Sequence, residues 1–155
     1  MTLPIGVTAS AVDALRECIR AALPLPDAVG GVTVFDGPAP ERAYAPRAVT
    51  VAAAFEDDQD AVLVERVESG ARPNVTETLT VAGSVYAGGG DVNVDHFRDE
   101  VGTILTAIDA ALKADRTLGG VVHLARLASA QWLQGRDAKG TGVRIGFTIQ
   151  LVSLS

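Results

Sequence analysis

Cysteine is nearly absent from this sequence, because Cys18 is the only one in 155 residues. An intramolecular disulfide and a cysteine-ligated metal cluster are therefore excluded, and Cys18 is expected to be a small buried hydrophobe on the first helix. Histidine is almost as scarce, with His96 and His123 far apart along the chain. No catalytic or metal-binding motif surrounds either of them, so we expect no enzyme activity, no metal and no cofactor.

Aromatic residues are also few, at 5% of a chain that is 48% hydrophobic. The core must therefore consist mostly of Val, Leu, Ile and Ala, with Trp132 and four phenylalanines as large fillers, which favours a sheet-rich structure. The length predicts one domain over residues 1–155. No apolar run approaches the ~20 residues that span a bilayer, and the N-terminus does not resemble a secretion signal. We expect a chain that is made in the cytoplasm and has no membrane partner.

The charge is negative overall and uneven along the chain. The net charge of −6 opposes the phosphate neutralisation that drives nucleic-acid binding, so a direct grip on DNA is disfavoured. Residues 1–112 carry seven arginines and seventeen acidic residues, whereas residues 113–155 carry six basic and two acidic residues. This asymmetry fits either chance placement of solvated charges or two surfaces that attract each other between copies.

Two amphipathic helices are predicted. The first begins at Ser10, which with Asp13 resembles a capping box, and ends at Pro24; Met1 to Gly6 would remain as a flexible arm. The second is capped near Asn93 or Asp95 and carries a continuous apolar stripe from Phe97 to Leu112.

Six strands are expected between and after these helices. Their predicted ranges are 31–35, 48–55, 61–68, about 75–86, 121–133 and a last strand in which Val143 to Leu151 alternate inward. The acidic run from Glu56 to Asp60 is interpreted as a hairpin tip, and Gly88 to Gly90 as a flexible turn. The predicted fold class is α+β, with a mainly antiparallel sheet of about six strands and two helices packed on one face, in the order α-β-β-β-β-α-β-β.

One junction is more specific than the rest of the chain. A helix ends in Asp115-Arg116-Thr117-Leu118-Gly119-Gly120, and a strand and a terminal hairpin follow. This arrangement, with a Val-rich strand after the first helix, a Val-x-Val strand at Val49 to Val51 and the long Thr/Val strand at Thr76 to Val85, resembles the tail terminator and tail-completion proteins of long-tailed bacteriophages. The likeness extends over nearly the whole chain.

The resemblance implies a virion structural protein without enzymatic activity. Such proteins form a ring, commonly a hexamer, on the head-proximal end of the tail tube, in the tail-neck region of a virion assembled in the bacterial host. The implied partners are other copies of the chain, the tail-tube protein and the neck or connector proteins. DNA would pass through the lumen without specific binding.

A ring needs two different patches that meet between neighbouring copies. We predict that Arg116, Arg126 or Arg144 faces the acidic tip of a neighbour, formed by Glu56, Asp57, Asp58 and Asp60. The face of the long strand that carries Thr76, Thr78 and Thr80 is the second interface candidate, with an ordinary solvent-facing strand as the alternative.

Two other functions stay open. A head-closure or connector protein of the same virion type would have a similar size and would also form rings. A small soluble enzyme or ligand-binding module with a scattered site would instead carry a closed apolar pocket with convergent polar groups.

Overall fold

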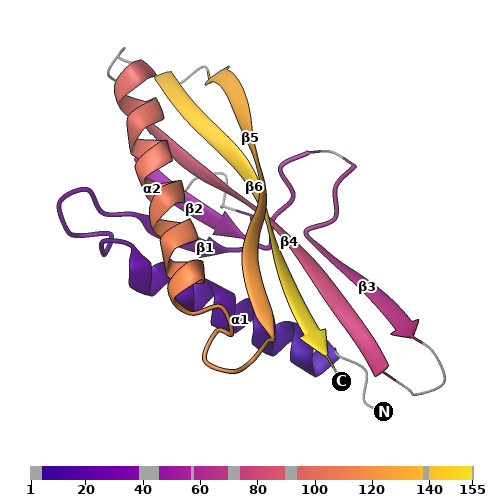
Figure 1. Ribbon diagram of the computed structural model, residues 1–155. Coiled ribbons are helices and arrows are strands. Elements are labelled where there is room, and N and C mark those ends of the chain that lie inside the picture. The colour runs from indigo at the N-terminus through magenta and orange to yellow at the C-terminus, as the bar shows by residue number, and fades with distance from the viewer. Residues whose placement is uncertain are drawn as a thin grey trace.

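The computed structural model describes residues 5–38, 46–56, 58–69, 74–89, 94–137 and 140–154. Its elements follow the chain as α1 (Ile5–Ala22), β1 (Thr33–Asp36), β2 (Arg47–Val51), β3 (Val62–Ser69), β4 (Asn74–Gly89), α2 (Val94–Ala114), β5 (Leu124–Asp137) and β6 (Gly140–Leu154) (Figure 1). Over these residues the fold is α+β, with two helices and one six-stranded sheet.

The sheet is mixed, so the expected mainly antiparallel sheet is wrong. Its order is β1-β2-β4-β6-β5, and β3 also pairs with β4. β1 and β2 run parallel, with Thr33 opposite Ala48 and Asp36 opposite Val51. The connection between them returns the chain to the start of the neighbouring strand, where a hairpin would have reversed its direction.

The first helix also differs from its prediction. Ser10 lies in the second turn of α1, so it does not cap the helix, and Ile5 and Gly6 belong to α1 rather than to an arm. A cap contributes only about 1 kcal/mol, a weak preference that the surrounding helix overrides. Asn93 lies outside the described residues, whereas Asp95 occupies the first turn of α2.

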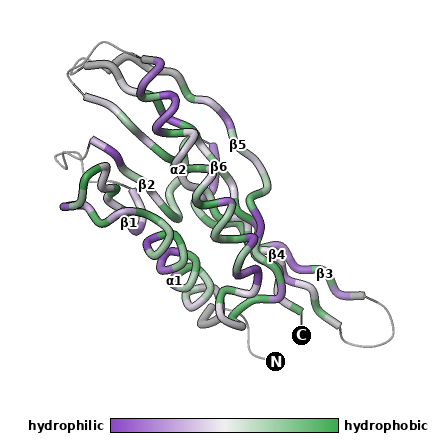
Figure 2. Tube along the Cα trace, turned by 60° about the vertical axis from the view of Figure 1, so that its left-hand side comes forward, coloured by the Kyte–Doolittle hydropathy of each residue, from purple (hydrophilic) through white to green (hydrophobic). Residues whose placement is uncertain are grey.

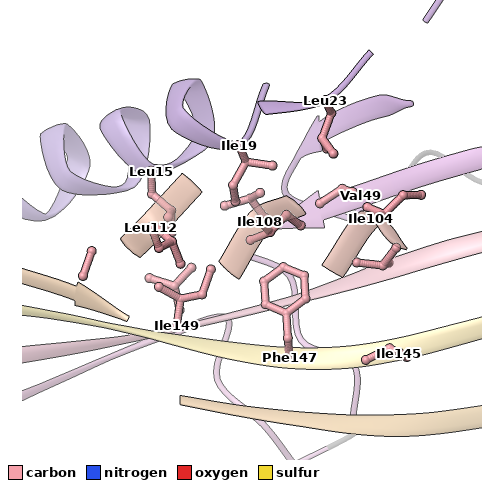
Figure 3. Close-up of a cluster of buried hydrophobic side chains, with 14 of the residues drawn as sticks. Leu15, Ile19, Leu23, Val49, Ile104, Ile108, Leu112, Ile145, Phe147 and Ile149 are labelled. Carbon is pink, nitrogen blue, oxygen red and sulfur yellow. The ribbon is translucent and has the colours of Figure 1, made fainter. Parts of the chain in front are cut away.

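Both helices lie on one face of the sheet, where they close a single hydrophobic core. α2 packs on β4, β5 and β6, and α1 packs on α2 and β1. Figure 3 shows Leu15 and Ile19 of α1 directed toward Leu112 and Ile108 of α2, and Phe147 rising from β6 below them. The predicted inward alternation of β6 is confirmed, because Val143, Ile145, Phe147, Ile149 and Leu151 are all buried. We call the opposite side of the sheet the open face.

β2 and β3 do not form the hairpin that the sequence suggested. Both pair antiparallel with the same edge of β4, β2 along Gly83 to Ala87 and β3 along Asn74 to Val81. At the break between them, the Ala53 N–H donates to the Ala82 carbonyl, and the Ala82 N–H donates to the Ala61 carbonyl. Residues 54–56 and 58–60 therefore belong to an excursion from an otherwise continuous edge, where a hairpin tip was expected. Ala52, at φ 60°, turns the chain out of the strand.

The junction after α2 is a tight left-handed turn. Leu118, Gly119 and Gly120 have φ values of 50°, 71° and 92°, and the Leu118 side chain is nevertheless buried in the core. The Val122 N–H donates to the Thr117 carbonyl, and the Ala125 N–H to the Arg116 carbonyl. These bonds attach the turn to the start of β5.

Gly120→Ala is expected to destabilise the fold by about 1–2 kcal/mol, because an L side chain resists this backbone conformation. No atom lies within 4 Å of the added Cβ, so the cost is conformational rather than steric. Gly102→Ala is the matched control, because its Cβ also meets open space but its backbone is helical. That control should stabilise the protein by about 0.5–1 kcal/mol. Urea unfolding measures both, and equal effects of the two substitutions would contradict the argument.

Candidate interaction surface

The part of the open face nearest β2 is covered by aromatic rings. A Cβ on Gly146 would collide with the Phe55 ring at 2.4 Å, so this ring from the excursion rests on the open face of β6. Gly146 pairs with Ser84, which pairs with Thr50, and the hydroxyls of Thr50 and Ser84 are buried and 2.7 Å apart. Tyr86 covers Gly88 and Gly142 in the same way. The predicted turn at Gly88 is wrong, because Gly88 and Gly89 lie within β4. A side chain at position 88 would collide with the Tyr86 ring.

The rest of the open face carries no helix. It lies at the ends of the strands where β3 joins the sheet, and in both views β3 stands on the side of the sheet away from the helices (Figures 1 and 2). We call this area the bare patch; it is formed by Leu63, Glu65, Val67, Thr76, Thr78, Thr80, Leu124, Arg126, Gln150, Val152 and Leu154.

The bare patch is more apolar than a solvated surface requires. Leu63, Val67 and Leu154 are 41%, 62% and 51% exposed, and threonines separate them. Val64, on the opposite face of β3, is 42% exposed as well. β3 therefore shows hydrophobic side chains on both faces as well as a free edge, a combination that natural sheets normally avoid unless a partner covers it.

The three predicted threonines do not lie on an edge. β4 is the central strand, paired with β2 and β3 on one side and with β6 on the other. Thr76, Thr78 and Thr80 are half-buried and point to the open face, between β3 and β6. Their side chains can therefore contact a neighbouring copy, whereas their backbone is already paired with β3 and β6.

The acidic segment projects from the excursion. Glu56, Asp58 and Asp60 are exposed, and Asp57 lies outside the described residues. The Phe55 N–H donates to Gln59 Oε1, which holds the base of the excursion together. Within the described part of the chain, none of these three carboxylates has a cationic partner within 4.0 Å.

The three predicted arginines are all exposed. Arg126 donates from Nε and Nη2 to the neutral Gln150 Oε1, at 3.0 and 2.6 Å, and shares the open face with Arg144. Arg116 lies in the junction after α2. As for the acids, no described carboxylate lies within 4.0 Å of these arginines, so the structure does not bring the two predicted sets together within one chain.

Sequence reasoning missed the exposed hydrophobic residues. Trp132, expected in the core, is 49% exposed on the outer strand β5. A bulge between Leu127 and Ser129 shifts the alternation of β5, so that Trp132 pairs with Ile145 on the helix side but at the margin of α2. For β3 a signal was available, because Val62-Leu63-Val64 lacks the alternation of a strand with one buried face.

A small cavity lies on the helix side, between the end of α1, the start of β2 and α2. Its volume is about 340 Å³, and Leu23, Val32 and Ile104 form its apolar wall. At its rim Arg47 Nη2 lies 2.6 Å from Glu100 Oε1, and His96 Nε2 lies 3.1 Å from the same oxygen. Glu100 thus contacts both Arg47 and His96, and among the described lining residues the exposed Asp99 is the one charged side chain outside this group.

The remaining chemically reactive candidates are spread through the fold. Cys18 is half-buried against the core, and burial, with a smaller contribution from the Asp115 charge, raises the pKa of its thiol above the ordinary 9.0. A raised pKa disfavours the thiolate that a nucleophile requires. In the part of the chain that the structure covers, no three His, Cys, Asp or Glu side chains form a metal-binding group, and neither helix is long and apolar enough to span a membrane.

Comparisons with known proteins identify no family. No protein-family model matches the chain, and no curated protein matches its sequence.

Proposed function

We propose that this chain is a virion structural protein of the tail-terminator type. Its copies form a closed ring, expected to be a hexamer, that caps the head-proximal end of a tail tube and joins it to the neck. Neighbouring copies, the tail-tube protein and the neck proteins are its partners, and DNA passes through the ring without specific binding.

The observation that carries this proposal is a pair of oppositely charged surfaces that have no ion-pair partner among the described residues. Glu56, Asp58 and Asp60 project from the excursion, and Arg116 and Arg144 are exposed elsewhere. Heterologous contacts join two different patches, and they close into a ring when the rotation between copies permits it. A partly apolar bare patch on the same molecule supports an assembling subunit over an independent monomer.

Reversing two charges of the excursion tests the proposal. Asp58→Lys/Asp60→Lys should shift the chain from a ring of about six times 16.0 kDa toward monomer, measured by size exclusion with light scattering. Asp27→Lys/Asp99→Lys makes the same charge change on exposed residues away from the excursion and should leave the ring intact. Adding Arg144→Glu or Arg116→Glu to the reversed chain should restore assembly, and raised salt should weaken the original ring.

A binding assay with tail tubes that lack their terminator protein distinguishes the proposal from its alternatives. The chain should bind their ends even where the free ring is weak, because ring formation depends on concentration and on the bound tube. Binding to portal complexes instead would identify a head-closure or connector protein. A chain that stays monomeric and binds neither partner would contradict the proposal. That result would favour the alternative of a ligand-binding module or enzyme, with the cavity near Glu100 as its site.

A further inference from the structure

Four strands of the sheet form an antiparallel unit with two free edges. Their order across the sheet is β3-β4-β6-β5, and every pairing among them is antiparallel. Among the described residues, β3 pairs only with β4, and β5 pairs only with β6. One row runs Leu63, Thr80, Gln150 and Arg126, so the outer strands lie at the same level on opposite sides of this unit.

An even number of alternating strands has a consequence for cyclic assembly. β3 and β6 run in one direction, and β4 and β5 run in the other. Rotation about an axis roughly along the strands preserves these directions, so β5 of one copy meets β3 of the next copy antiparallel. The sheet can then continue across the joint over the length of β3. Beyond Val62, β2 and β1 occupy this side of β4, so the neighbouring β5 has to leave the edge after its bulge between Leu127 and Ser129.

The two edges carry opposite charge. On β3, Arg66 is paired with Glu77, while Glu65 and Glu68 have no ion-pair partner among the described residues. On β5, the partner of Arg126 among the described residues is the neutral Gln150, and Leu124 to Leu133 contains no acidic residue. The acidic edge and the basic edge are thus complementary between copies.

We propose that β3 of one subunit pairs antiparallel with β5 of the next, with Glu65 opposite Arg126. This interface rests on the proposed ring and names its subunit joint. The register sets Val67 against Leu124 on the open face and Val64 against Leu127 on the helix side. It therefore covers the exposed valines and gives Arg126 a carboxylate that its own chain does not supply.

Other registers are less complementary. Shifts of two residues keep each side chain on its own face of the sheet, whereas a shift of one exchanges the faces. With Leu63 opposite Arg126, Glu65 would face Leu124; with Val67 opposite Arg126, Arg66 would face Leu127. Both registers set Arg126 against an apolar side chain, whereas the proposed register gives it a carboxylate. Pairing two β3 edges would bring Glu65 and Glu68 of both copies together, and would close a dimer rather than a ring.

Disulfide trapping tests the register directly. Cys18→Ala removes the one native thiol, and Val67→Cys/Leu124→Cys then places the two proposed opposites on one chain. Mild oxidation should give a ladder of covalent multimers on a non-reducing gel, because each chain links to two neighbours. A dimer formed by Val67→Cys alone would show β3–β3 pairing and overturn the proposal. A stronger ladder from Val67→Cys/Arg126→Cys would overturn the register.

A charge exchange supplies an independent measurement. Glu65→Arg should raise the concentration needed for half-assembly about tenfold, equivalent to 1.4 kcal/mol, and adding Arg126→Glu should recover it. Asp27→Arg, the control, should change nothing, and circular dichroism verifies that each variant is folded. Rings of unchanged mass without the ladder would refute this joint and leave the ring proposal standing. Absence of rings and of tube binding in the unmodified chain would refute the ring itself.

Discussion

Phe147→Ala is expected to lower the free energy of unfolding by about 3–5 kcal/mol. The ring is fully buried on β6, in the layer between the sheet and α2 (Figure 3). Few other aromatic residues are available to refill the space, so the cavity should persist. Since a domain has only about 5–15 kcal/mol of stability, thermal unfolding should occur roughly 10 °C lower or more.

Phe147→Leu is the control for this loss. Leucine keeps most of the apolar contact and should cost clearly less than alanine in the same denaturant titration. Equal effects of the two substitutions would show that the site collapses around either side chain, and would contradict the packing described for β6.

Gly83→Ala is expected to destabilise the protein by about 1–3 kcal/mol or more, for the opposite reason. The new Cβ would lie 2.3 Å from the Thr50 carbonyl oxygen and 2.6 Å from Cζ of Phe147. The carbonyl belongs to the neighbouring strand β2 and cannot rotate away, so β2 and β4 must separate locally. Thermal unfolding followed by circular dichroism measures the cost.

Gly89→Ala is the matched control on the same strand. Its Cβ would meet the Phe97 ring at 3.6 Å, an ordinary van der Waals contact, so the change should stay within about 0.5 kcal/mol. Combining Gly83→Ala with Phe147→Ala should cost less than the sum of the two, because the ring that opposes the Cβ is gone. Strict additivity would show that Phe147 does not constrain Gly83.

The spacing of apolar residues along the sequence predicted most of the helices and strands of this fold. The stripe from Phe97 to Leu112 located α2, and the alternation from Val143 to Leu151 located the strand that lines the core. Both signals are strong because one side of each element is buried along its whole length.

The pairing of strands needed information that no local window contains. The acidic run from Glu56 to Asp60 predicts a break between two strands, but the strands on either side of it pair with β4 rather than with each other. The parallel pairing of β1 and β2 depends likewise on where the chain returns. Local residues decide that a strand ends, whereas distant partners decide which edge the next strand joins.

The candidate surface was predictable only in part. Composition located the charged residues, and each described member is exposed or, for the threonines, half-buried on the open face. The exposure of the Val64, Val67 and Trp132 side chains was not expected, because the sequence does not show which hydrophobic strand segments the helices leave uncovered.

The hydrogen bonds on either side of the excursion hold the strand edge in place independently of the length of the excursion. Ala53 and Ala61 both bond to Ala82, so the strand edge resumes beside the residue at which it stopped. The sheet on either side does not depend on how many residues lie between these two anchors. Residues can therefore be inserted between Phe55 and Gln59 while the strands keep their alignment, whereas Phe55 has to stay because its ring covers Gly146. A label inserted there would lie beside the acidic residues of the proposed ring contact and would report on assembly.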